Sequence, residues 1–340
     1  MQKQDKINLF FYSSKDEVEK GFERNSMRRN FKAALELSNV NYSIKESDDF
    51  DAVFFTSIYS ENKLRESTTK EYKKIVCAFF NEEENKQNLY NFKDGKNPNI
   101  SKLRDTCVKK LNEYDVVLVP SLEAEVVLRE NGVTSKIEKI NPPVRSKKFD
   151  LALKSRKNIS KIYFKFSGEQ KYVHLIINRS DVVAEKRILD IARTFPKYKF
   201  IVIIPDMKRN SFVKNFIFRK YPSNMIIRDV LEEDVYISMV YNSLGLVMVN
   251  SCPGNVIESF ECMTIKKPIL SLKESTYSDV LIDKKNAHIY NNLEALKEGV
   301  KDLFEGKLEP LNKEGYLDDR DNITNTAKKV VEIYKELKEN

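Results

Sequence analysis

Several residue types are scarce in this chain of 340 residues, and each scarcity excludes a class of protein. Nine glycines and ten prolines are too few for a collagen-like or low-complexity chain. No apolar run approaches the roughly 20 residues that a membrane-spanning helix needs. Residues 7–12 form a short apolar run near the start, which predicts a first β-strand because it lacks a signal peptide's cleavage site.

Metal-ligating residues are also few. The two histidines do not point to a shared site, since His174 lies in an apolar run that predicts a buried strand and His288 lies in a loop-like stretch. The four cysteines have neither zinc nor redox spacing, so we expect reduced, mostly buried thiols. They are Cys77, Cys107, Cys252 and Cys262.

The chain is basic, with a formal net charge of +8. Such a charge is compatible with nucleic acid, an anionic membrane or phosphorylated substrates, and composition alone leaves these choices open. No nucleic-acid motif accompanies the charge, so our interpretation includes no nucleic-acid partner.

Unbroken apolar runs of four to six residues alternate with amphipathic stretches. Runs without period-two alternation are typical of parallel strands covered on both faces by helices. We expect strands at 7–12, 52–56, 75–80, 116–120, 137–140, 173–177, 200–204, 225–227, 245–249 and 268–272. We expect helices at 26–38, 100–113, 123–131, 185–194 and 211–221. The alternation occurs twice and predicts two doubly wound α/β domains.

The boundary between the two domains is expected within residues 141–150. The sequence there, Asn-Pro-Pro-Val-Arg-Ser-Lys-Lys-Phe-Asp, has two prolines that forbid a continuous helix and a charged run that suits a linker. We therefore place the first domain at 1–145 and the second at 146–324. Residues 325–340 carry a strong helical pattern, and in folds of this kind such a helix often crosses back to the first domain.

Residues 247–270 carry the most informative pattern. An apolar strand runs into a Pro-Gly loop, a short helix opens near Asn255 and carries Glu258, and Lys-Lys-Pro precedes a second apolar strand. This layout resembles the sugar-nucleotide site of retaining glycosyltransferases. In that family one glutamate opens the loop and a second follows eight residues later. Glu258 matches the second, whereas Asn250 stands in place of the first.

The resemblance extends over nearly the whole chain. Similar segments are Leu-Phe-Phe-Tyr-Ser-Ser at 9–14, Tyr-Asp-Val-Val-Leu-Val-Pro-Ser at 114–121, Asn-Pro-Pro-Val-Arg at 141–145 and Glu-Lys-Arg-Ile-Leu-Asp at 185–190. Their order resembles the family 4-like glycosyltransferases that add a sugar to glucosyl-diacylglycerol. The resemblance implies a GT-B fold, with two Rossmann-like domains facing a cleft. The first would lie on the acceptor and membrane side, and the second would bind the donor nucleotide.

The resemblance also implies a UDP-sugar donor held without a metal or other cofactor. Cationic side chains and a helix N-terminus would neutralise the diphosphate. Lys186 and Arg187 fit this role, although they also fit a solvated helix start. Gly21, in the first glycine-containing loop, would also lie on the donor side.

The remaining donor contacts would come from the motif at 247–270. The backbone amides of Gly254, Asn255 and Val256 would meet the sugar or phosphate, and Glu258 would accept hydrogen bonds from the ribose. Glu258 also fits an ordinary first-turn carboxylate that the helix dipole stabilises. Asn250 would touch the sugar as a catalytic-site residue.

Three positions depart from the family. Asn250 replaces a glutamate, Phe79 and Phe80 stand where the family has His-x-His, and Glu23 occupies a position where a small residue is usual. Asn81 and Glu82 are the polar residues left for a catalytic role on the acceptor side.

Two basic amphipathic segments, 22–32 and 207–221, favour contact with an anionic membrane. The alternative is an aromatic stripe facing the core with a solvated basic face. We expect a cytoplasmic protein, peripheral on the inner face of the membrane.

These observations leave three functions open. The first is a retaining hexosyltransferase that uses a UDP-sugar and a glycosyl-diacylglycerol acceptor. The second is a catalytically silent paralogue that serves as a partner or scaffold, for instance of another glycosyltransferase. The third is a glycosyltransferase with a protein or polysaccharide acceptor.

Overall fold

The computed structural model describes most of the chain, in segments. These are residues 8–12, 22–37, 41–43, 50–56, 58, 71–80, 90–91, 99–145, 148–149, 158–166, 170–177, 181–204, 221–229, 231–311 and 319–339. The chain forms two compact units, and the main boundary between them lies between Val144 and Arg145. Unit 1 comprises Met1–Glu19, Glu23–Val144 and Asp319–Asn340, and unit 2 comprises Lys20–Phe22 and Arg145–Asp318.

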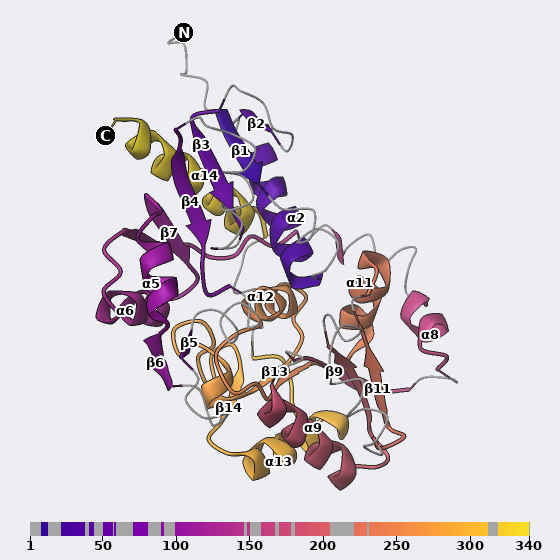
Figure 1. Cartoon of the computed structure of the whole chain (residues 1–340). Helices are drawn as coiled ribbons and strands as arrows, with labels where there is room; N and C mark the ends of the chain where they lie inside the picture. The colour runs from indigo at the N-terminus through magenta and orange to yellow at the C-terminus, as the bar shows by residue number, and fades with distance from the viewer. Residues whose placement is uncertain are drawn as a thin grey trace. The chain divides into compact units, whose positions relative to one another are not determined.

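Unit 1 is built on a parallel sheet of six strands (Figure 1). Their order is β2 (Asn41–Ser43), β1 (Asn8–Tyr12), β3 (Ala52–Phe55), β4 (Lys73–Cys77), β7 (Val116–Val119) and β8 (Lys136–Lys139). β3 and β7 are buried at every position. Strands covered on both faces need apolar side chains throughout, which explains the unbroken apolar runs.

Aromatic rings fill the core of unit 1. Phe11 stacks on Phe54 at a centroid distance of 5.3 Å, and Phe31 of helix α2 (Phe22–Leu37) meets the same ring at 5.2 Å. Phe31 also meets Phe80 edge-on at 6.0 Å. Offset and edge-to-face pairs of this kind add to the stabilisation from buried area.

Helix α6 (Leu122–Glu130) follows β7, and Ser121 caps it by accepting hydrogen bonds from the amides of Glu123 and Ala124. The stretch 100–113, expected as one helix, is instead a strand followed by a helix. Strand β6 (Asn99–Leu103) pairs antiparallel with β5 (Tyr90–Asn91), and α5 (Asp105–Leu111) begins only after Arg104. Strand pairing, a tertiary contact, outweighs the local helical pattern here.

The C-terminal helix α14 (Asp319–Glu339) packs within unit 1, beside its strands in Figure 1. It begins earlier than the expected residue 325. The Tyr334 hydroxyl donates to Asp51 Oδ2 at 2.7 Å, and Thr326 Oγ1 donates to the Asn141 carbonyl at 3.0 Å. Lys329 forms an ion pair with Glu138. These contacts tie the end of the chain to unit 1.

Unit 2 contains a second parallel sheet of six strands. Their order is β11 (Met225–Arg228), β10 (Lys199–Ile203), β9 (Tyr172–Ile176), β12 (Leu246–Met248), β13 (Ile269–Leu272) and β14 (His288–Tyr290). His288, expected in a loop, therefore begins an edge strand. That strand is partly exposed along its length, so it lacks the apolar run by which the other strands are predicted.

Helices cover both faces of the second sheet. On one face α9 (Val182–Thr194) and α13 (Leu293–Phe304) share a core with alternate strand residues such as Val173 and Leu175. On the other, His174 faces Cys262 of α12 (Val256–Thr264). Helix α11 (Glu233–Asn242) packs against the short α8 (Ile159–Tyr163). The ten strand positions predicted from the sequence all lie on strands, and the expectation of two Rossmann-like α/β domains is confirmed.

Candidate functional site

The strand order of unit 2 contains a switch point between β9 and β12. β9, the first strand of the unit, is followed on one side by β10 and β11 and on the other by β12, β13 and β14. In open parallel sheets, ligands bind outside the carboxyl ends of the strands where the order reverses. The candidate site is therefore formed at the carboxyl edge of the sheet, by the residues that follow the end of β9 at Ile176 and the end of β12 at Met248.

Arg187 of α9 braces the segment that leaves β12, residues 249–255, which we call the site loop. Its Nη1 donates to the carbonyl of Val249 at 2.9 Å and to that of Asn250 at 3.0 Å. Its Nη2 donates to Glu274 Oε1 at 2.5 Å, and Glu274 lies on the 3₁₀ helix Lys273–Ser275. The Arg187 guanidinium is thus engaged within the chain, which makes it a positioning group for the site loop.

Asp181 holds the same loop from the N-terminus of α9. Its Oδ1 caps the helix by accepting from the Ala184 amide at 2.9 Å. Its Oδ2 accepts from both the amide and the hydroxyl of Ser251, at 2.8 and 2.9 Å. Ser275 adds a bond of 2.7 Å to the Asn250 carbonyl. Asp181 is fully buried, so removing its carboxylate from water costs free energy. These hydrogen bonds must offset that cost.

Two buried asparagine side chains of the site loop meet at one carbonyl. Asn255 Nδ2 donates to the Ile176 carbonyl at 2.8 Å, and Asn250 Nδ2 lies 3.4 Å from the same oxygen. Asn255 has a left-handed backbone (φ +52°) and does not cap α12 with its side chain. Its buried Oδ1 has no hydrogen-bond partner among the residues that the structure describes. An acceptor and a helix N-terminus therefore lie together at the start of α12.

Glu258 and Glu261 are both buried on α12, at 1% and 0% exposure. Glu261 forms an ion pair with Lys148 and accepts from the Tyr236 hydroxyl at 2.7 Å. Burial, then the charges of Glu261 and Glu258, raise the pKa of Tyr236 well above its usual range, so it stays a neutral donor. Glu258 lies in the first turn of the helix, as the sequence predicts.

The predicted donor-binding residues are only partly brought together. Gly254, Asn255 and Val256 lie buried at the start of α12, close in sequence to Glu258. Lys186 is exposed on α9, beside Arg187, and makes no ion pair within the described part of the chain. The predicted residues Gly21, Asn81 and Glu82 lie outside the described residues.

Phe79 and Phe80, which replace the histidines of the similar family, are fully buried in unit 1. Phe79 has a left-handed backbone (φ +67°), which is a rare conformation for a bulky side chain. Such strained residues cluster at functional sites. The residues that follow the carboxyl end of β4 are therefore candidates for a functional position, although phenylalanines replace the histidines there.

Residues that sequence reasoning missed include Asp181, Glu274 and Ser275. Asp181 carries a readable signal, because an aspartate directly before a helical pattern is a preferred N-cap. Glu274 and Ser275 carry none, since they reach the site loop only through the pairing of β12 with β13.

The two histidines lie apart from the candidate site. His174 is fully buried in β9, with Nδ1 2.9 Å from the Ser243 hydroxyl. Burial, reinforced by the charge of Lys267, lowers its pKa to about 3, so the ring is neutral and structural. Within the described segments no group of three or more His, Cys, Asp or Glu residues is placed to hold a metal ion.

No protein-family model matches the chain, and no curated protein matches its sequence significantly. Solved structures do match its fold. A sucrose-phosphate synthase from Thermosynechococcus elongatus aligns with a TM-score of 0.69 at 10% identity, over 98% of this chain and 99% of its own. WaaG, a glycosyltransferase involved in lipopolysaccharide biosynthesis, aligns with a TM-score of 0.57 at 12% identity, over 95% and 99% of the two chains.

A trehalose-6-phosphate structure from E. coli, bound with UDP-2-fluoro glucose, also aligns, with a TM-score of 0.57 at 10% identity. The alignment covers 91% of this chain and 77% of that one. None of the helices in the described part of this chain is both long and apolar enough to span a bilayer.

The three structural alignments show that the chain has the GT-B fold over nearly its whole length.

Proposed function

We propose that this chain is a retaining glycosyltransferase that moves a hexose from a UDP-sugar to a glycosyl-diacylglycerol acceptor at a membrane surface. One observation carries the proposal: a braced polar loop lies at the switch point of the second sheet, in a fold that solved glycosyltransferases share. The lipid acceptor and the peripheral membrane location rest on the sequence resemblance. Side chains of residues 22–28 and the segment 207–220 lie outside the described residues.

The proposed donor site uses the start of α12 as its anion-binding end. First-turn amides from Val256 onward carry partial positive charge and suit a diphosphate. Lys186, exposed on α9, supplies a cation that the diphosphate can reach. Arg187 holds the site loop in place, since its guanidinium already contacts two carbonyls and Glu274.

Glu258 is the proposed partner of the ribose hydroxyls. It is 1% exposed, so a bound ribose reaches its carboxylate only if the site loop shifts. Asn250 is the proposed contact to the donor sugar. Its amide is neutral, and its carbonyl is fixed by Arg187 and Ser275. The loop would therefore position the sugar by hydrogen bonds instead of a carboxylate charge.

In the proposed reaction the bond between the anomeric carbon and the β-phosphate oxygen breaks, and UDP leaves with the electron pair. The acceptor hydroxyl oxygen bonds to the anomeric carbon on the same face, and its proton passes to the β-phosphate oxygen of the departing UDP. Positive groups near the diphosphate stabilise the charge that develops there. Asn81 and Glu82 remain the proposed polar groups on the acceptor side.

Titration calorimetry with UDP-glucose tests the donor site. Glu258→Gln should weaken binding by about 1.5–3 kcal/mol, because the charged acceptor of the ribose hydroxyls is lost. Glu294→Gln is the matched control, since Glu294 lies in the first turn of α13 and is exposed. Equal affinity of both variants and the wild type would place Glu258 in a structural role.

A second candidate function is a catalytically silent paralogue that binds a partner protein. Buried Phe79 and Phe80 at the end of β4, and Asn250 in place of a glutamate, favour it. Turnover of radiolabelled UDP-glucose with glucosyl-diacylglycerol vesicles separates the two. Binding of UDP without turnover would favour the silent paralogue. Turnover with a protein or polysaccharide acceptor, and none with the lipid, would favour the third function.

A further inference from the structure

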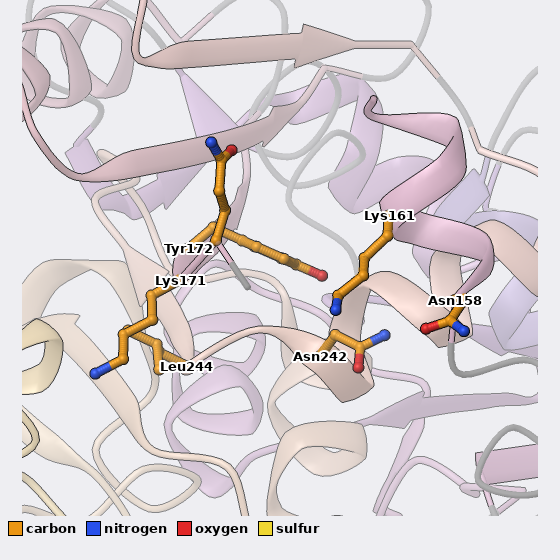
Figure 2. Close-up of a pocket in the computed structure, with 7 residues that line it drawn as sticks. Asn158, Lys161, Lys171, Tyr172, Asn242 and Leu244 are labelled. Carbon is orange, nitrogen blue, oxygen red and sulfur yellow. The ribbon is translucent and has the colours of Figure 1, made fainter. Parts of the chain in front are cut away.

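Unit 2 has a pocket at the opposite end of β9 from the candidate donor site. Its volume is about 200 Å³, and Figure 2 shows the side chains around it. It lies where β9 begins, at Tyr172, whereas the site loop lies where β9 ends, at Ile176. The pocket is lined by Asn158, Lys161, Gln170, Lys171, Tyr172, Asn242 and Leu244.

Hydrogen bonds between α8 and α11 fix the wall of this pocket. The Ser160 amide donates to Ser238 Oγ at 3.0 Å, and the two hydroxyls lie 3.1 Å apart. Asn242 Nδ2 donates to the Ser238 carbonyl at 2.8 Å, and the Tyr172 hydroxyl donates to the Met239 carbonyl at 2.9 Å. The space is therefore formed before any ligand enters, as is usual for small-molecule sites.

The lining is cationic and rich in amides. Lys161 and Lys171 form no ion pair within the described part of the chain, and the described lining contains no acidic residue. In Figure 2 the Lys161 side chain extends from α8 towards Asn242 and the Tyr172 hydroxyl, while Lys171 lies beyond Tyr172. Lys161 is thus the lysine that points towards the other lining side chains, whereas the Lys171 ammonium points away from them.

We propose that this pocket binds a small phosphate ester of a polyol, with its phosphate at Lys161 and its hydroxyls at the amides of Asn158, Gln170 and Asn242. An ammonium is a suitable point charge for phosphate, and amide side chains both donate to and accept from hydroxyls. The pocket is smaller than the 300–1,000 Å³ or so of drug-sized sites, which favours a compact ligand over a nucleotide. The proposal concerns a second site and does not depend on the donor site.

Calorimetry with three probes tests the proposal: inorganic phosphate, glycerol 3-phosphate and glycerol. We expect glycerol 3-phosphate to bind, phosphate to bind more weakly, and glycerol not to bind. Lys161→Gln should lower the affinity for glycerol 3-phosphate about tenfold or more, because a charged hydrogen bond is lost. Lys171→Gln should lower it less. Binding of phosphate as tight as that of the ester would remove the polyol from the proposal.

The double variant Lys328→Gln/Lys335→Gln is the matched control for Lys161→Gln/Lys171→Gln. Both control lysines are exposed on α14 in unit 1, so the change in net charge is the same. Equal loss of affinity in the two double variants would show a general charge effect and overturn the proposal. An alternative role for Lys161 is to stabilise the C-terminal end of α11. Lower thermal stability of Lys161→Gln, with no binding by the wild type, would establish that role instead.

Discussion

The two units have the same kind of sheet but fill their cores differently. Strand β1 of unit 1 buries Leu9, Phe10 and Phe11, and its neighbours supply further rings. Strand β9 of unit 2 buries His174 beside Ser243. Unit 2 also buries carboxylates on α12 and at the start of α9. One topology is therefore stabilised by aromatic packing in one unit and by polar networks in the other.

The difference shows which parts of the chain are held in a single arrangement of side chains. Aromatic packing yields free energy from buried area and tolerates changes of similar volume. A buried ion pair or hydrogen-bonded carboxylate yields little net stability, but it allows few alternative arrangements. In unit 2 such groups hold the site loop and α12, through Asp181, Arg187 and Lys148. This placement supports the proposal that the donor site lies in unit 2.

The largest effect is expected from breaking the buried network of unit 2. Lys148→Met should lower the free energy of unfolding by about 3–5 kcal/mol, because Glu261 keeps its charge and loses its cation. Urea denaturation measures this change. Lys148→Met combined with Glu261→Gln should recover part of the loss, since the amide still accepts from Tyr236. A cost below about 1 kcal/mol for Lys148→Met would contradict a buried pair.

Arg187 and Lys186 are adjacent cations on α9, and we expect the first to affect mainly stability and the second mainly UDP binding. Arg187→Gln should lower stability by about 1.5–3 kcal/mol, because two loop carbonyls and Glu274 lose a charged donor. Lys186→Gln should leave stability within about 0.5 kcal/mol, since its side chain is exposed, and should weaken UDP binding. Thermal unfolding with and without UDP separates the two effects. The reverse pattern would exchange the positioning and contact roles of these residues.

His174 should make unit 2 sensitive to acid. Its pKa falls from about 6.5 in the unfolded chain to about 3 in the folded one, so only the unfolded chain binds the proton between these values. Stability is full above pH 6.5 and declines as the pH falls towards 3, by about 2 kcal/mol at pH 5. His174→Asn, which can still bond to Ser243, should flatten this slope. An unchanged slope in urea midpoints between pH 7 and 5 would assign the acid sensitivity to other groups.

Among the substitutions at buried positions, the smallest effect is expected in the aromatic core of unit 1. Phe54→Leu should cost less than about 1.5 kcal/mol, because an apolar side chain of comparable size can repack against Phe11 and Phe31. Urea denaturation compares it with Lys148→Met. A loss of unfolding free energy as large as that of Lys148→Met would show that the aromatic core tolerates substitution no better than the buried polar network does.

Much of the fold was predictable because its signals are local. Buried parallel strands appear as unbroken apolar runs, and each expected run lies on a strand. Segments stabilised by partners distant in the chain were not predictable. Strand β6 pairs with β5 and was predicted as helix, and the partly exposed β14 carries no apolar run. For the candidate site, the sequence singled out Arg187, Asn250, Asn255 and Glu258 as candidates, but it did not show the residues that hold them in place.

The sequence by itself determined the alternation of strands and helices, and with it two doubly wound domains and the position of α12. It did so because side-chain periodicity and turn residues act within a few residues of the chain. Only the tertiary structure decided that Arg187 braces the site loop, that Asp181 bonds to Ser251, and that Phe79 takes a left-handed backbone. Each of these depends on groups brought together by strand order and packing, and distances across a sheet are not encoded in local spacing.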